Sequence, residues 1–292
     1  MIVQQLNKVI YRPQDRPIVF DLIFEDTVKS APLIVFCHGY KGYKDWGAWG
    51  LLAKAFASQG IAFLKFNFSH NGGTVQQPLD FPDLEAFAQN NYSKELHDLS
   101  CVLDWVIENH EEGNAIDLKS IFLMGHSRGG GIVTIQASED LRVKKVITLA
   151  GVSDYKSRFP KGDALRRWKK DGVYYVENKR TRQQMPHHIQ FYNDFLAHEA
   201  RLDIERAAKK CTIPHLILHG DDDQAVSIEE AKKLHVWSSS SIYKCIEGGN
   251  HVFGAKQSWE DSEMPPNLIK VWAEILDFIN NYAYFLRKML FI

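Results

Sequence analysis

The stretch SIFLMGHSRGG, residues 120–130, decides the fold class of this chain. An apolar run leads directly into GHSRG (residues 125–129), and a helical pattern follows. A serine in G-x-S-x-G between a strand and a helix is typical of a strained turn that lifts the hydroxyl clear of a parallel sheet. Glycine is needed two positions on either side, because a side chain there would collide with the turn. The pattern therefore predicts Ser127 as a nucleophile.

Around this turn, short apolar runs alternate with longer helical patterns, which is typical of an α/β protein whose mostly parallel sheet carries helices on both faces. The expected strands are Lys8–Tyr11 paired antiparallel with Pro17–Phe24, then Leu33–Cys37, Ile61–Ser69, Ser120–Ser127, Lys144–Gly151, His215–Gly220 and Ser241–Glu247. The expected helices are Trp46–Gln59, Ser93–Asn109, Arg128–Ser138, Ile228–Trp237 and Asn267–Tyr284. Residues 70–91 are predicted to form a long connection.

The alternation breaks between residues 153 and 200, where charge and aromatic residues are frequent and no strand pattern is visible. We predict one core domain made of residues 1–152 and 201–292, with residues 153–200 as an insertion. Ten lysines and arginines lie between Lys156 and Arg182, against three acidic residues. Such a basic patch could receive an anionic substrate, or it could be a solvated helix face.

The partners of the serine are expected later in the chain, in the order acid and then histidine. The strand HLILHG runs into three aspartates, residues 221–223, which leave the acid ambiguous on chemistry alone. The spacing after the glycine favours Asp223, and its two neighbours are expected to cap the turn and the following helix. The last strand is followed by GGNH (residues 248–251), which places His251 in a glycine loop. We predict His251 as the general base.

A serine hydroxyl needs a base to become a nucleophile, and the oxyanion formed on attack needs hydrogen-bond donors. The expected scheme has His251 take the Ser127 proton while Asp223 orients the imidazole. Two backbone N–H groups are predicted to hold the oxyanion. One belongs to Arg128, directly after the nucleophile, and the other to Tyr40, which follows a His-Gly turn.

With these residues in view, the chain resembles the dienelactone-hydrolase and cinnamoyl (feruloyl) esterase branch of the α/β-hydrolase superfamily. The matching segments are HGYKGYKDW (38–46), FNFS (66–69), GHSRGG (125–130), HGDDDQAV (219–226) and GGNHVF (248–253). The resemblance implies a metal-free hydrolase of carboxylic esters with an inserted lid above the site. True dienelactone hydrolases carry a cysteine at the nucleophile position, so Ser127 favours an esterase.

Composition narrows the class of protein further. The 292 residues are 45% hydrophobic and carry a formal net charge of −1, which gives no sign of nucleic-acid or membrane binding. The four cysteines are widely spaced, which predicts buried free thiols and no metal site. The first residues lack the pattern of a secretory signal. We expect a cytoplasmic monomer or homodimer without a cofactor.

The sequence thus predicts a serine esterase acting on small or medium acyl or aryl esters. Three alternatives stay open: an acyl-coenzyme A type thioesterase, a peptidase-like hydrolase with the same triad, and a catalytically inactive hydrolase fold that binds a ligand. Four aromatic residues could contact the substrate, or could equally anchor a loop or the lid to the core. They are Trp46, Trp168, Tyr174 and Tyr175.

Overall fold

The computed structural model describes residues 1–110 and 115–289, with side chains described up to residue 281. Its centre is an eight-stranded sheet in the order β1-β2-β4-β3-β5-β6-β9-β10. The strands are β1 (Ile2–Arg12), β2 (Asp15–Glu25), β3 (Ala31–Cys37), β4 (Ala62–Phe66), β5 (Ile116–His126), β6 (Val143–Leu149), β9 (His215–Gly220) and β10 (Ser241–Ile246). The pairs β1–β2 and β2–β4 are antiparallel, and the other pairs are parallel.

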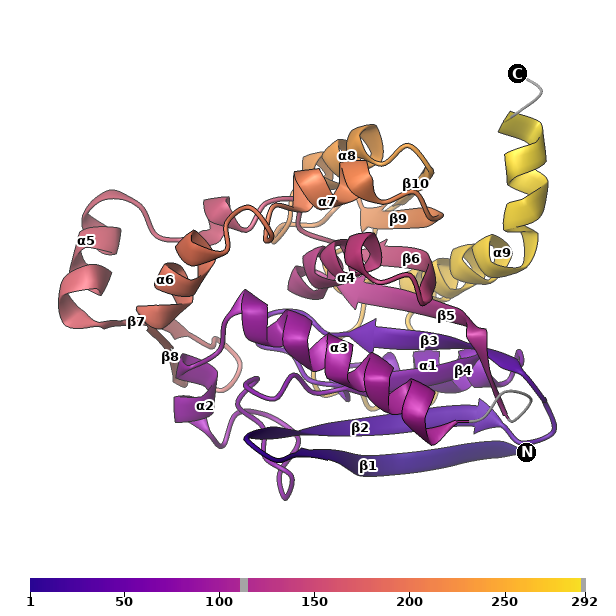
Figure 1. The fold of residues 1–292 in the computed structure, drawn as a ribbon, viewed down its shortest axis with the longest axis horizontal. Coiled ribbons are helices and arrows are strands. Elements are labelled where there is room, and N and C mark those ends of the chain that lie inside the picture. The colour runs from indigo at the N-terminus through magenta and orange to yellow at the C-terminus, as the bar shows by residue number, and fades with distance from the viewer. Residues whose placement is uncertain (111–114, 290–292) are drawn as a thin grey trace.

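Helices cover both faces of this sheet (Figure 1). On one face lie α3 (Tyr92–Asn109), α4 (Arg128–Glu139), α7 (Ile204–Lys210) and α8 (Ile228–Trp237). On the other lie α1 (Trp49–Ala57) and α9 (Pro266–Met289). No helix within residues 1–110 and 115–289 has the length and hydropathy needed to cross a membrane.

Strand β3 shows how the sequence builds two cores from one sheet. Its apolar run is buried throughout, and successive side chains point to opposite faces. Leu33, Val35 and Cys37 join the cluster under α3 and α4, whereas Ile34 and Phe36 join the cluster under α1 and α9. A strand buried on both sides has no polar alternation, which is why an uninterrupted apolar run predicted it correctly.

The predicted elements of the core are present, with most ends shifted by a few residues. The observed bounds of β9 and α8 are those predicted. Helix α3 begins one residue earlier than expected, because Asn91 caps it by accepting a hydrogen bond from Lys94 N at 2.8 Å. The connection of residues 70–91 contains one short helix, α2 (Leu84–Ala88). The sequence also missed α7.

Residues 153–200 contain helical segments η1 (Lys156–Arg158), α5 (Gly162–Asp171) and α6 (Gln190–Ala197). They also contain a separate antiparallel pair, β7 (Val173–Glu177) and β8 (Gln184–His188), so the expected absence of strands was wrong. Neither strand has a second neighbour, and β8 carries proline and two histidines, which hides the usual apolar signal. Figure 1 shows this insertion beyond the carboxyl ends of the parallel strands.

Candidate active site

Ser127 occupies the turn between β5 and α4 with φ 55° and ψ −117°, a strained conformation for a residue with a side chain. The flanking glycines are required by close packing. A Cβ on Gly125 would lie 2.2 Å from Gly129 O, and one on Gly129 would lie 2.4 Å from Cys37 O. The turn therefore presses against the end of β3, and it leaves the Ser127 side chain at the carboxyl edge of the sheet.

Asp223 and His251 come together because the loops after β9 and β10 touch. A Cβ on Gly220 would lie 1.9 Å from Gly249 O, and Asp222 N donates to the same carbonyl at 3.0 Å. Across this contact His251 Nδ1 lies 2.8 Å from Asp223 Oδ2. A hydrogen bond at Nδ1 fixes the imidazole tautomer and leaves Nε2 for other chemistry.

The Asp223 carboxylate is buried and well supplied with donors. Its Oδ1 accepts from the backbone N–H groups of Ala225 at 2.8 Å and Val226 at 2.9 Å, and His219 Nε2 lies 3.2 Å from Oδ2. Burial opposes its charge, but the hydrogen bonds from His219, His251 and Val226 outweigh burial and hold the pKa of Asp223 well below its usual range. The group is therefore ionised at neutral pH.

The two neighbouring aspartates make hydrogen bonds other than those expected. Asp221 Oδ1 accepts from Gly248 N at 2.7 Å, which ties the acid loop to the histidine loop. Asp222 Oδ1 accepts from the side chain of Gln224. Neither caps α8, because Ser227 does so by accepting from Glu229 N. The predicted helix cap was wrong, and the serine directly before the helix was the better candidate.

A second histidine contacts His251. His126 Nε2 lies 2.8 Å from His251 O, and the two rings are 4.8 Å apart. Burial lowers the pKa of His126 to about 3, so the ring is neutral and donates its Nε2 proton to that carbonyl. The sequence placed His126 beside the turn but gave no sign of this contact, which depends on how two distant loops meet.

The segment after β3 lies against the nucleophile. A Cβ on Gly39 would be 2.9 Å from Ser127 Cβ, so the backbone entering Tyr40 passes directly beside the serine. The backbone N–H groups of Tyr40 and Arg128 donate to no acceptor among the described residues. Both donors thus belong to segments that lie directly beside Ser127 or follow it in the chain.

Buried charges hold this segment in place. Lys44 Nζ lies 2.8 Å from both carboxylate oxygens of Asp21, and Lys65 Nζ pairs with Asp21 and Asp45. Both lysines and Asp21 are almost fully buried. Removing one member of such a group leaves an unpaired buried charge and costs about 3–5 kcal/mol. No role was predicted for these residues, although Lys65 and Asp21 inside apolar strand patterns were a usable signal.

Ser127 and His251 line one cavity of about 600 Å³. Of the aromatic residues predicted to contact substrate, Trp168 and Tyr174 line this cavity. Trp46 instead packs against the apolar core, and Tyr175 is 54% exposed; neither is among the lining residues. Residues 153–200 also contribute Tyr155, Phe159, His187 and Phe191 to the lining, and Tyr92 comes from α3. The space beside the serine is therefore largely aromatic.

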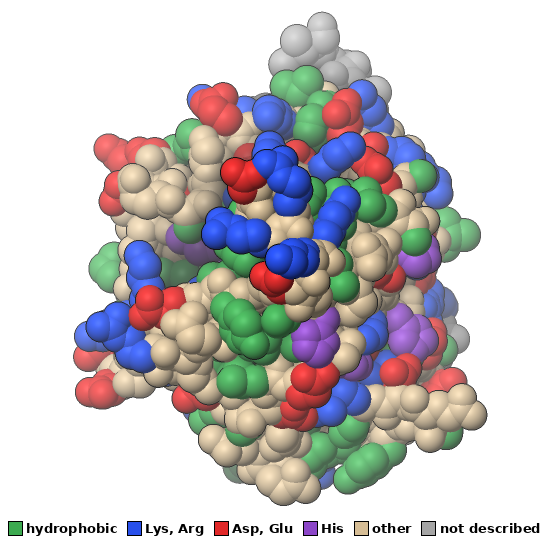
Figure 2. All heavy atoms as spheres, turned by 90° about the vertical axis from the view of Figure 1, so that its left-hand side faces the viewer, with side chains coloured by type: hydrophobic (Ala, Val, Ile, Leu, Met, Phe, Trp, Pro, Cys, Tyr) green, Lys and Arg blue, Asp and Glu red, His purple; other side chains and the backbone are tan. Residues whose placement is uncertain are grey.

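The basic run of the insertion faces solvent for the most part. Figure 2 shows lysine and arginine side chains gathered on this side of the molecule. Of the ten basic residues between Lys156 and Arg182, Arg158 is the one among those lining the cavity. Arg166 on α5 is 75% exposed and pairs with Asp163. The solvated-face interpretation fits this helix.

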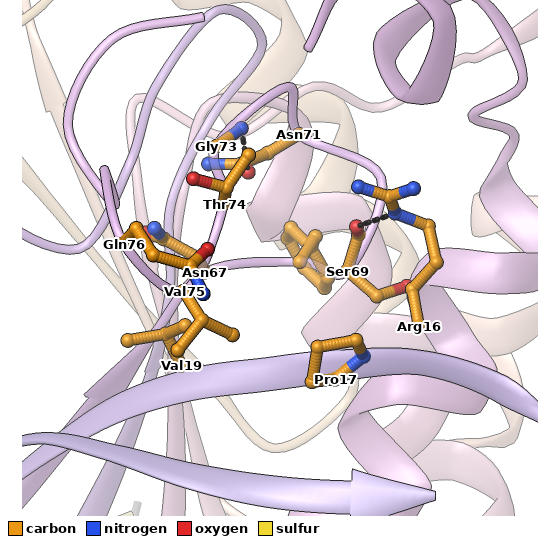
Figure 3. Close-up of a pocket in the computed structure, with 11 residues that line it drawn as sticks. Arg16, Pro17, Val19, Asn67, Ser69, Asn71, Gly73, Thr74, Val75 and Gln76 are labelled. Atoms are coloured by element: carbon orange, nitrogen blue, oxygen red, sulfur yellow. Dashed lines mark hydrogen bonds between the residues drawn. The ribbon is translucent and has the colours of Figure 1, made fainter. Parts of the chain in front are cut away.

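A second cavity of about 340 Å³ lies between the start of β2 and the connection after β4 (Figure 3). Its 11 lining residues include Arg16, Asn67, Ser69 and Thr74, and Arg16 Nε donates to Ser69 O at 3.1 Å. Ser127 and His251 are not among them. The larger cavity is therefore the candidate active site.

Residues 29–253 match the family model described as serine aminopeptidase, S33. The chain belongs to this family of α/β-hydrolases. No curated protein matches the chain. The expected fold class and the resemblance to α/β-hydrolases are confirmed.

Solved structures agree on the fold. Est1E from Butyrivibrio proteoclasticus with ferulic acid bound has a TM-score of 0.69 at 19% identity, covering 90% of this chain and 94% of that one. A putative hydrolase from Agrobacterium vitis S4 has a TM-score of 0.69 at 16% identity, covering 96% and 100%. A monoacylglycerol lipase from Paleococcus ferrophilus has a TM-score of 0.61 at 14% identity, covering 86% and 95%.

Proposed function

We propose that this hydrolase is a serine esterase that cleaves carboxylic esters of small or medium acyl or aryl groups through an acyl-enzyme on Ser127. The observation that carries the proposal is the hydrogen bond between buried Asp223 and His251, made at a cavity that Ser127 also lines. An ionised carboxylate fixed on Nδ1 makes the opposite nitrogen, Nε2, the proton acceptor.

The reaction follows from these positions. His251 Nε2 takes the hydroxyl proton as Ser127 Oγ attacks the ester carbonyl, and the oxyanion receives hydrogen bonds from the N–H groups of Tyr40 and Arg128. Collapse releases the alcohol, which takes the proton from His251. A water molecule, deprotonated in turn by His251, then releases the acid. Among the hydrogen bonds of the described residues none joins Ser127 to His251, so the hydroxyl must turn towards the ring as substrate binds.

The lining of the cavity favours esters over peptides. The residues around Ser127 are mainly aromatic and apolar, and none of the lining residues is an aspartate or glutamate that could hold a peptide α-ammonium group. Est1E, which shares the fold, was solved with ferulic acid bound, an aromatic acid that suits a cavity of this kind. Aryl and medium acyl esters are therefore the substrates we propose.

We assign residues 153–200 the role of a lid. This segment supplies Phe159, Trp168, Tyr174, His187 and Phe191 to the cavity wall opposite the strand ends. These side chains exclude water from the site, and the absence of water strengthens every hydrogen bond made to the reacting carbonyl. The mechanism needs no metal or cofactor, because the nucleophile, base and oxyanion donors are all groups of the chain itself.

The test compares hydrolysis rates on three substrates that share one acyl chain: an aryl ester, a coenzyme A thioester and an anilide. We expect the ester to be cleaved fastest. Ser127→Ala should lower that rate by at least about 10⁴-fold, because the step that forms the acyl-enzyme is lost. Ser138→Ala, on the same helix and away from the cavity, is the matched control and should keep the rate.

A dominant thioester rate would replace the esterase by the thioesterase alternative while retaining the triad. A dominant anilide rate would do the same for the peptidase alternative. Equal rates for wild type and Ser127→Ala on every substrate would contradict the whole mechanism. Detection of an acyl group on Ser127 by mass spectrometry after rapid quenching gives an independent measure of the covalent step.

A further inference from the structure

The side chain of Arg128 makes contacts that are separate from those of its backbone N–H. The guanidinium carbon lies 4.5 Å from the ring centre of Tyr40, 5.2 Å from that of Tyr92 and 5.3 Å from that of Phe191. All three rings line the cavity beside Ser127, and the Arg128 side chain is only 13% exposed. A full positive charge is therefore fixed in the aromatic wall next to the nucleophile.

This charge is only partly compensated. Arg128 Nη1 donates to Glu95 Oε1 at 3.1 Å, and Glu95 is 3% exposed. A guanidinium has five N–H donors, yet Glu95 Oε1 is the one side-chain acceptor it meets among the described residues. Burial raises the pKa of Glu95, although the positive charge of Arg128 acts in the opposite direction. A raised pKa favours the neutral form of Glu95, which compensates the charge of Arg128 less well. Several donors of Arg128 are left for a ligand.

The rest of the cavity does not supply an acidic counterpart. Its charged lining residues are Lys41, Arg128 and Arg158, and no aspartate or glutamate is among the lining residues. Arg158 pairs with Glu230, and Lys41 Nζ donates to the backbone carbonyl of Glu177. Both of these cations belong to exposed or half-buried residues, whereas the Arg128 side chain is only 13% exposed and contacts three aromatic rings. Arg128 is the cation that directly follows Ser127 in the chain, and the two residues line the same cavity.

We infer that the Arg128 guanidinium binds a carboxylate carried by the substrate, which makes the substrate class an ester with a free carboxylate group. The inference rests on the proposed esterase function and narrows it. A planar guanidinium matches a carboxylate through two parallel hydrogen bonds, and the surrounding rings keep water away. A neutral ester leaves these donors without an acceptor, so the site discriminates by charge as well as by shape.

The experiment measures kcat/KM for pairs of esters matched in size. One pair places the charge on the acid part: para-nitrophenyl hydrogen adipate against para-nitrophenyl heptanoate. The other places it on the alcohol part: the hexanoyl ester of para-hydroxybenzoate against that of para-cresol. We expect the wild type to prefer the charged member of at least one pair by about tenfold or more.

Variants separate recognition from structure. Arg128→Met should remove the preference for the charged ester, and Arg128→Lys should retain part of it, because the ammonium keeps the charge but loses the planar fork. Glu95→Gln should increase the preference, because it removes the competing negative charge. Arg166→Met, an exposed arginine outside the cavity, is the matched control and should leave the preference unchanged. Thermal unfolding of each variant reports whether it is folded.

The result that overturns the inference is Ser127-dependent cleavage of the neutral esters with no preference for the charged members. Loss of preference in Glu95→Gln equal to that in Arg128→Met would also overturn it, because the pair would then act as a structural unit. Inhibition of heptanoate cleavage by adipate gives a second readout, and it should weaken at least tenfold in Arg128→Met. Failure of the esterase proposal looks different, since neither charged nor neutral esters would then depend on Ser127.

Discussion

The two walls of the cavity are built in different ways. One wall consists of the ends of β3, β5 and β9 and the loop after β10, and it is held by close approaches at glycine residues. Gly39 lies against Ser127, Gly129 against Cys37 and Gly220 against Gly249, each too close for a Cβ. This wall carries Ser127, Asp223 and His251, which we propose as the nucleophile, the acid and the base. Its geometry has almost no freedom to relax.

The other wall is residues 153–200, and side chains hold it. Trp168 Nε1 donates to His187 O at 2.8 Å, and the Tyr155 ring stacks on Tyr92 at 3.8 Å. The Tyr155 hydroxyl also donates to Arg128 O at 2.8 Å. Side chains of this kind can be exchanged without moving the strand ends. The difference predicts that substitutions in the second wall change substrate binding more than they change the positions of Ser127, Asp223 and His251.

The largest effect is expected from a substitution that disrupts the first wall, the one that carries Ser127. Gly220→Ala places a methyl group where Gly249 O now lies, so the acid and histidine loops must separate. We expect kcat/KM to fall by at least about 100-fold, since a displacement near 1 Å of catalytic groups has that effect. The free energy of unfolding should fall by about 3 kcal/mol. Urea unfolding and ester hydrolysis measure the two effects.

Gly50→Ala is the matched control for that change. Gly50 lies within α1 and has no atom within 4 Å of a Cβ placed on it. Alanine is the better helix former, so this variant should gain about 0.5–1 kcal/mol of stability and keep full activity. Equal activity in the two alanine variants would contradict the description of the first wall as rigid.

A smaller effect is expected from the side-chain wall. Trp168→Ala removes a buried ring that lines the cavity and anchors β8, and should cost about 3 kcal/mol of stability. We expect KM for aryl esters to rise more than kcat falls, because Asp223 and His251 stay in place. Tyr175→Ala removes an exposed aromatic side chain from the same segment of residues 153–200, and it should change neither KM nor stability. A loss confined to kcat would instead make Trp168 part of the catalytic geometry.

The smallest effect concerns Asp98 on α3, the helix that supports the insertion. Burial raises its pKa from 3.8 to about 6, although Arg12 lies 2.9 Å away and Ser69 donates to it. The folded protein therefore binds more protons than the unfolded chain between pH 4 and pH 6, and the stability from this group is lost as pH rises through that window. The unfolding free energy of wild type relative to Asp98→Asn should fall by on the order of 1–2 kcal/mol across it. A flat or rising difference would contradict the raised pKa.

Much of the first wall could be predicted from local sequence. Ser127 and the glycines around it follow from the steric requirements of one turn, and the pattern that reveals this turn spans only residues 125–129. Asp223 could be singled out among three aspartates by spacing alone, and the structure places it beside His251. The second wall could not be read in this way. Strands β7 and β8 were missed because each pairs only with the other. No residue of β7 is buried, and the buried residues of β8 are Met185 and His187, which do not form an apolar run.

The sequence by itself determined the alternation of strands and helices, the strained turn at Ser127 and the order of acid and histidine. These depend on backbone sterics and hydrophobic periodicity, which act over a few neighbouring residues. Only the tertiary structure decided that His126 contacts the His251 loop, that Lys44 and Lys65 share the buried carboxylate of Asp21, and that Arg128 lies among three rings. Such contacts join segments far apart in the chain, and their free energy depends on burial, which no local pattern specifies.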